Sequence, residues 1–210
     1  MKLGYSTYAM QRLDIFEALP RTRSIGYDAL EIAVGDDWPT APRKLDAAAR
    51  QKLVNLLKGL GFPPPALFGP VPTCAQGDAR QAMLGHFVEI CTLARDLNFG
   101  SEPAVVTSTL SGRQLDWDTE KETVAKDLLE LADLAAGANT ILAIEPHVGG
   151  AFETPKKAAW LMQQTHHSHL RLNFDTANIL YYNQPINGEI ALAKVCPWVS
   201  HMHLKDSHGE

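Results

Sequence analysis

The chain has 210 residues, of which 45% are hydrophobic and 20% are charged. This composition can bury a core, so it excludes a wholly disordered chain, and at roughly 100–200 residues per domain it predicts a single domain over residues 1–210. The formal net charge of −5 disfavours a nucleic-acid-binding protein that works by neutralising the phosphate backbone.

The cysteines and the apolar pattern indicate the compartment. Cys74, Cys91 and Cys196 form no CxxC pair, so the sequence indicates neither a disulfide framework nor a cysteine zinc site. A reducing compartment fits best, and we expect the protein to be cytoplasmic. No stretch of about 18 consecutive apolar residues occurs, so we expect no membrane span.

Short β-like runs alternate with longer helical patterns along the whole chain. In chain order, we predict a β-like run at Lys2–Tyr8, a helix at Leu13–Ile25, a run at Ala29–Val34, a helix whose apolar residues recur from Leu45 to Leu60, a run at Ala66–Val71, a helix from Asp78 to Leu97, a run at Ala104–Thr107, a helix from Asp118 to Gly137, a run at Ile141–Glu145, a helix that starts at Thr154 and Pro155, a run at Leu170–Asp175, a helix at Glu189–Val195 and a run at Val199–Leu204.

Seven β–α alternations favour an α/β fold, in which a parallel sheet is covered by helices. A doubly wound open sheet and an incomplete (β/α)8 barrel both fit this count. The chain has neither a GxGxxG nor a GxxxxGK[ST] motif, so a nucleotide-binding doubly wound fold loses its best support.

Polar side chains end three of the predicted strands. Glu145 closes a run of hydrophobic residues, Asp175 closes the next run, and His201, His203 and Lys205 share one face of the last run because side chains alternate along a strand. The carboxyl ends of parallel barrel strands meet at one mouth, where polar residues are typical of catalysis. Two carboxylates and an imidazole there make an incomplete shell for a hard divalent cation.

Each of these residues also has a structural interpretation when taken alone. Glu145 could be a surface or capping group, Asp175 could cap the following helix, and the two histidines could be core or rim residues. Their convergence at successive strand ends makes the three structural interpretations together improbable. Glu31, within the second run, could face the same mouth. A cluster of histidines before the sixth run is a weaker metal candidate: His166, His167 and His169.

Several motifs of the chain resemble the xylose-isomerase-like TIM-barrel superfamily, a group of sugar (phosphate) isomerases and epimerases. They are Leu3–Ser6, Gly26–Glu31, Ala143–His147, Thr154–Pro155, Leu170–Asn178 and His201–Asp206. The resemblance implies a (β/α)8 barrel whose metal ligands are Glu145, Asp175 and His203, with His203 preferred to His201. The family's fourth ligand is a Glu at the end of an eighth strand, and this chain ends before one. We therefore expect seven βα units and an open sheet edge that favours a homodimer.

The resemblance also implies an activity. We expect a metal-dependent isomerase or epimerase that acts on a small sugar-like carbonyl compound through an enediolate, with Glu145 as the catalytic carboxylate. We expect a single divalent cation as cofactor, manganese, magnesium, cobalt or zinc. The expected substrate contacts are His147, Asn178, His201, Lys205 and Glu31. Asn178 stands where the ketose-epimerase branch often has a histidine, which argues against that branch.

Three alternatives remain open from the sequence. A sugar or inosose dehydratase would use the same scaffold and related chemistry. An apurinic endonuclease is disfavoured, because it needs more histidines at strand ends and because the net charge is acidic. A non-catalytic binding or partner subunit would retain the fold without a complete site.

Overall fold

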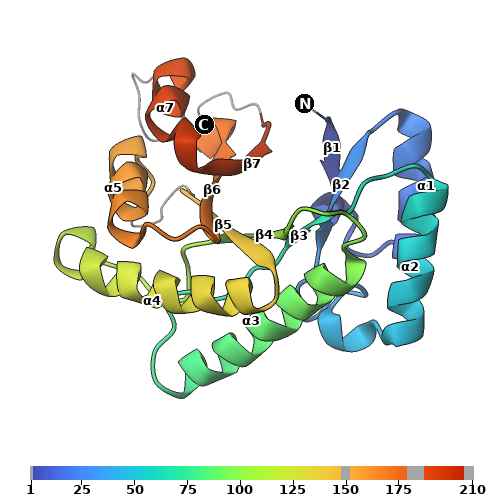
Figure 1. Ribbon diagram of the computed structural model, residues 1–210, viewed down its shortest axis with the longest axis horizontal. Coiled ribbons are helices and arrows are strands. Elements are labelled where there is room, and N and C mark those ends of the chain that lie inside the picture. Colours follow the sequence, from blue (N-terminus) through green and yellow to red (C-terminus); the bar gives the residue numbers. More distant parts are fainter. Residues whose placement is uncertain (1, 148–151, 179–186, 206–210) are drawn as a thin grey trace.

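The computed structural model describes residues 2–147, 152–178 and 187–205. Seven parallel strands form a single sheet, in which each strand pairs with the next one along the chain. The strands are β1 (Gly4–Ser6), β2 (Ala29–Ala33), β3 (Ala66–Phe68), β4 (Ala104–Thr109), β5 (Thr140–Glu145), β6 (Leu170–Asp175) and β7 (Val199–His203). The sheet curls as in a TIM barrel, with helices around its outer side (Figure 1). The prediction of a barrel-type α/β fold with seven βα units is confirmed.

The helices follow the predicted order, with small shifts at their ends. They are α1 (Ile15–Ile25), α2 (Ala47–Gly59), α3 (Asp78–Leu97), α4 (Trp117–Gly137), α5 (Pro155–Thr165) and α7 (Gly188–Val195), with 3-10 helices η1 (Thr7–Met10), η2 (Pro42–Lys44) and η3 (Cys196–Trp198). Thr154 caps α5 as predicted, because its hydroxyl accepts the amide of Lys157 at 3.2 Å. Asp116 caps α4, so that helix begins at Trp117 and not at Asp118. Among the described residues, no helix is long and apolar enough to span a membrane.

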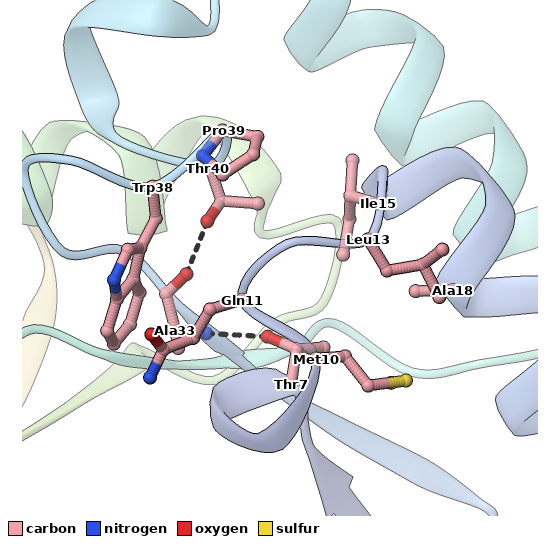
Figure 2. A pocket seen from close by; sticks show the side chains of 10 residues that line it. All are labelled: Thr7, Met10, Gln11, Leu13, Ile15, Ala18, Ala33, Trp38, Pro39 and Thr40. Carbon is pink, nitrogen blue, oxygen red and sulfur yellow. Dashed lines mark hydrogen bonds between the residues drawn. The ribbon is translucent and has the colours of Figure 1, made fainter.

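The first strand is shorter than its sequence pattern predicts. It stops at Ser6, and η1 begins at Thr7. The Thr7 hydroxyl accepts the backbone amide of Ala33 at 2.9 Å, and the Thr40 hydroxyl donates to the Ala33 carbonyl at 2.5 Å (Figure 2). The backbone amide and carbonyl of Ala33 are therefore bonded to the hydroxyls of Thr7 and Thr40, and the pairing of β1 with β2 ends at Ser6 and Glu31.

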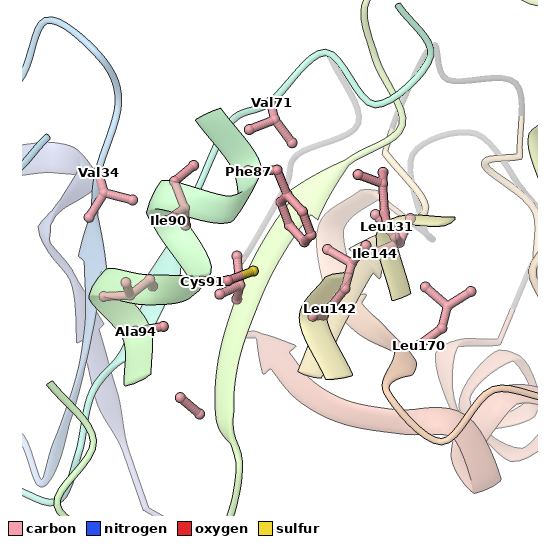
Figure 3. Close-up of a cluster of buried hydrophobic side chains, with 14 of the residues drawn as sticks. Val34, Val71, Phe87, Ile90, Cys91, Ala94, Leu131, Leu142, Ile144 and Leu170 are labelled. Atoms are coloured by element: carbon pink, nitrogen blue, oxygen red, sulfur yellow. The ribbon is translucent and has the colours of Figure 1, made fainter. Parts of the chain in front are cut away.

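The core lies between the sheet and the helices that cover it. Phe87, Ile90 and Cys91 of α3 are fully buried, as are Leu142 and Ile144 of β5, and all five belong to a single cluster (Figure 3). Burial of one such large apolar side chain contributes about 1.5–3 kcal/mol. Because side chains alternate along a strand, Leu142 and Ile144 on the helix-facing side place Glu145 on the inner face of the curl.

Candidate metal centre

The carboxyl ends of the last three strands carry the candidate metal ligands. Glu145, Asp175 and His203 are the final residues of β5, β6 and β7, and the register of β6 and β7 pairs Asp175 with His203. One ligand atom from each lies within 4.8 Å of the others. The two carboxylates are each 2% exposed, so both are held away from bulk water. The structure brings together the three residues that are expected from the sequence to be metal ligands.

Two asparagines hold the Glu145 carboxylate. Asn173 donates from Nδ2 to Oε2 at 2.8 Å, and Asn178 donates from Nδ2 to Oε1 at 2.6 Å. The Nδ1 atom of His203 lies 2.9 Å from Oε2, and the Lys205 ammonium lies 3.9 Å from Oε1. Each oxygen of Glu145 therefore has a fixed amide on one side and a cationic or titratable group on the other.

The two oxygens of Asp175 have different roles. Oδ1 accepts the backbone amides of Ala177 and Asn178, both at 2.9 Å, and so caps the turn that follows β6. Oδ2 is buried, and its close partner is a side-chain ammonium and not a backbone amide. The Lys205 ammonium lies 2.5 Å from it, and Nδ1 of His203 lies 3.8 Å away. The capping interpretation of Asp175 thus accounts for one oxygen and leaves the other for a cation.

The two ring nitrogens of His203 face different carboxylates. Nδ1 faces Glu145 and Asp175, whereas Nε2 lies 3.0 Å from Oε2 of Glu31. Burial opposes the charged ring, but the hydrogen bonds with Glu145 and Glu31 raise the pKa of His203 to about 10. The His201 ring packs edge-on against it at 5.4 Å. A cation bound at Nδ1 must displace a proton from that nitrogen.

Glu31 is a buried carboxylate at the centre of a hydrogen-bond network. It lies on β2, and its partners are Ser6 on β1, Thr107 on β4, and His201 and His203 on β7. Burial alone would raise the pKa of Glu31, but hydrogen bonds with the two histidines hold that pKa far below its usual range.

An open cavity of about 1220 Å³ lies inside the curl of the sheet. At the carboxyl ends of the strands it is lined by Tyr8, Glu31, Phe68, Glu145, His147, His201, His203 and Lys205. The Tyr8 ring meets Phe68 edge-on at 5.6 Å. Of the residues predicted to contact a substrate, Asn178 is buried behind Glu145, and the other four line this cavity.

A family model described as xylose isomerase-like TIM barrel matches residues 19–210. The chain belongs to this family. Because the match covers most of the chain, it confirms the resemblance that the strand-end motifs indicated. No curated protein sequence matches the chain.

Solved structures show the same fold. D-psicose 3-epimerase from Clostridium cellulolyticum H10, crystallised with D-tagatose, has a TM-score of 0.81 at 16% identity, covering 98% of this chain and 73% of that one. The probable 3-DHS dehydratase AsbF of Bacillus anthracis has a TM-score of 0.82 at 16% identity, covering 100% and 75%. A xylose isomerase-like TIM barrel protein from Mycobacterium smegmatis in complex with magnesium has a TM-score of 0.74 at 16% identity, covering 98% and 74%.

The donor set of this xylose isomerase-like chain fits a divalent cation. Glu145, Asp175 and His203 supply two carboxylates and an imidazole, a mixture that suits magnesium, manganese, cobalt or zinc. Among the described residues, the buried Oδ2 of Asp175 accepts no amide hydrogen bond and is paired with the Lys205 ammonium instead. An ammonium group already lies against it, which shows that the position is electrostatically suited to a positive charge.

The weaker histidine cluster lies at the opposite ends of the strands. The His169 ring bonds the carbonyl of Thr140, the first residue of β5, at 2.6 Å, and His167 lies 3.3 Å from Asp133 of α4. Among the described residues, the groups that can share an ion do not include these histidines.

Sequence reasoning missed three polar residues that support the site: Asn173, Ser6 and Thr107. Asn173 holds Glu145, and the two hydroxyls hold Glu31, each at 2.8 Å. Asn173 stands two positions before Asp175 in an otherwise largely apolar strand, so strand periodicity alone could have placed it on the same face. The hydroxyl residues carry no comparable signal, because Ser and Thr are ordinary strand residues.

Proposed function

We propose that this chain is a metal-dependent isomerase or epimerase of a small, sugar-like polyhydroxy carbonyl compound. The observation that carries the proposal is the convergence of Glu145, Asp175 and His203 beside an open cavity. Membership of the xylose isomerase-like family supports it, as do structural neighbours that include a D-psicose 3-epimerase.

In this proposal, Glu145, Asp175 and His203 hold one divalent cation, and the magnesium complex of a neighbour supports such a cofactor. The bound cation supplies the Lewis acidity that polarises a carbonyl and lowers the pKa of the adjacent C–H. The chain contributes the orientation of the ligands, because buried asparagine amides fix Glu145 and backbone amides fix Asp175.

Glu145 is the group that we assign to proton transfer. Its Oε1 atom removes a proton from the carbon beside the carbonyl and returns it to the same or the neighbouring carbon. The Asn178 amide at 2.6 Å orients that oxygen but cannot itself carry the proton. His147, His201 and Lys205 line the cavity and are the proposed contacts for substrate hydroxyls.

A dehydratase is the second candidate, and the position of Lys205 favours it. Its ammonium lies 3.9 Å from Oε1 of Glu145, so a base and a proton donor stand side by side. This pair could remove a proton from one carbon and protonate the hydroxyl that leaves its neighbour. A probable 3-DHS dehydratase among the structural neighbours supports this second candidate.

Metal content is the first test. The protein is stripped of metal, dialysed against mixed divalent ions and analysed by elemental mass spectrometry. We expect about one specific ion per chain, lost in Asp175→Asn and kept in His167→Asn, which controls for the distant histidine cluster. No specific ion in the unmodified protein would overturn the metal-dependent proposal.

Product analysis then separates the candidate reactions. A panel of neutral ketoses and aldoses is incubated with the ion-loaded protein and followed by mass spectrometry and chromatography. A product of unchanged mass supports an isomerase or epimerase, and loss of water supports a dehydratase. Glu145→Gln should lower turnover by orders of magnitude. Tight sugar binding with no product would instead indicate a non-catalytic binding subunit.

A further inference from the structure

Glu31 is a buried charge that the proposed chemistry does not use. Its side chain is 6% exposed, and donors from three other strands surround it. The Ser6 hydroxyl donates to Oε1, and the Thr107 hydroxyl donates to Oε2, both at 2.8 Å. The two β7 histidines approach Oε2 with their Nε2 atoms, His203 at 3.0 Å and His201 at 3.4 Å. A carboxylate held in this way has a fixed position and a fixed direction.

Glu31, His201 and His203 could by distance alone hold an ion of their own. The contacts argue against this. A carboxylate has about four acceptor sites, and four donors already surround Glu31. His203 would also have to serve two ions with one ring. By contrast, Oδ2 of Asp175 on the other side of that ring has one close cationic neighbour, the Lys205 ammonium at 2.5 Å.

We propose that Glu31 is a positioning residue that binds the Nε2–H of His203 and thereby presents Nδ1 to the cation held by Glu145 and Asp175. The two ring nitrogens point in different directions, so a carboxylate anchored on β2 determines which one faces β5 and β6. Metal-ligating histidines usually donate their second N–H to such an acceptor, and removing the acceptor typically costs 10–100-fold in metal affinity.

Asn173 completes this arrangement on the other side of the ring. Its Nδ2 must face Glu145 Oε2 at 2.8 Å, because the amide oxygen there would oppose a carboxylate oxygen. The same Nδ2 lies 3.0 Å from His203 Nδ1 and 3.4 Å from its Nε2, so it is closer to Nδ1. Nδ1 therefore faces an amide donor and two carboxylates, and Nε2 faces Glu31.

The inference rests on the proposed metal site, and Glu31→Gln tests it. This substitution keeps the shape of the side chain but removes the charge that holds the Nε2–H. Zinc is the probe, and its affinity is measured by competition with a chromophoric chelator. We expect Glu31→Gln to weaken zinc binding about 10–100-fold. Ser6→Ala is the matched control, because it removes a bond to the same carboxylate without touching His203, and it should change the affinity less than about threefold.

A spectroscopic readout separates positioning from a general loss of structure. The Nε2-bound proton of His203, followed by ¹H–¹⁵N NMR, should be shifted downfield and protected from exchange in the unmodified protein, with and without zinc. In Glu31→Gln it should lose both properties while the circular dichroism spectrum is unchanged. An unaltered Nε2 proton, or zinc binding equal to that of Ser6→Ala, would overturn the inference. If the unmodified protein binds no zinc, the proposed metal site fails, and the resonance of the metal-free protein still decides whether Glu31 orients the ring.

Discussion

At the scale of single residues, the site combines structural and chemical roles within one side chain. Asp175 uses one oxygen to cap the turn after β6 and leaves the other facing Lys205 and His203. The capped oxygen fixes the direction of the second one without any further residue. Lys205 can therefore be used to test the metal site, because its ammonium lies at the Asp175 oxygen that would bind a divalent ion.

We expect Lys205→Met to strengthen binding of a divalent ion. Burial opposes the charge of Lys205, but Asp175 raises its pKa above the usual value, so it is an ammonium that competes with the ion for the same oxygen. The side chain is 50% exposed, and pairs screened by solvent contribute about 0.2–1 kcal/mol, which corresponds to about a 1.4- to fivefold gain in zinc affinity. The measurement is the chelator competition, with exposed Lys156→Met as control. Weaker binding in Lys205→Met would show that the ammonium supports the ion.

The charged residues of the site could be predicted from the sequence, and their supporting network could not. Glu145, Asp175 and His203 each close a strand with a charged or titratable group, which is costly to bury without a purpose. The contact between Glu31 and His203 joins residues 172 positions apart, and only the curl of the sheet brings β2 against β7. The sequence predicts that Glu31 lies near the mouth of the barrel. It does not predict that His203 is the partner of Glu31.

At the scale of elements, periodicity located each described α-helix and strand but misjudged some ends. Ends depend on single side-chain bonds, such as the Thr7 hydroxyl that accepts the amide of Ala33 and ends β1 early. Pro20 lies inside α1, which continues through it although proline usually kinks or ends a helix. Hydrophobic spacing therefore predicts which segments pair and pack, whereas local hydrogen bonds decide where each one stops.

Two glycines offer a matched test of backbone geometry in these elements. Gly26 ends α1 with φ +112° and Gly85 lies inside α3, and an added Cβ would meet nothing within 4 Å at either. Gly85→Ala should stabilise the protein by about 0.5–1 kcal/mol, because alanine favours the helix. Gly26→Ala should destabilise it by about 1 kcal/mol, because alanine disfavours positive φ. Urea denaturation measures both, and shifts of the same sign would contradict the assigned geometry.

At the scale of the whole molecule, the charges around the cavity constrain what can enter it. Glu31, Glu145 and Asp175 bring three carboxylates to the carboxyl ends of the strands, and Lys205 is paired with one of them. The other Lys or Arg that lines the cavity among the described residues is Lys2, which precedes β1 and so lies at the opposite end of the strands. Residues 148–151, 179–186 and 206–210 contain no Lys or Arg in their sequence.

This distribution predicts a preference for uncharged substrates. A phosphorylated sugar carries about two negative charges, and the Lys205 ammonium at the mouth of the cavity is already paired with Asp175. Phosphate recognition normally relies on Arg, Lys or helix amino termini. We expect kcat/KM for a neutral ketose to exceed that for its phosphate ester by at least about tenfold, which corresponds to about 1.4 kcal/mol of transition-state stabilisation. The comparison uses sugars that differ only in the ester, with the ion-loaded protein at two salt concentrations. Because screening weakens charge repulsion, the preference should narrow as salt rises. A phosphate ester that reacts faster would show that Lys205 leaves Asp175 to bind the substrate.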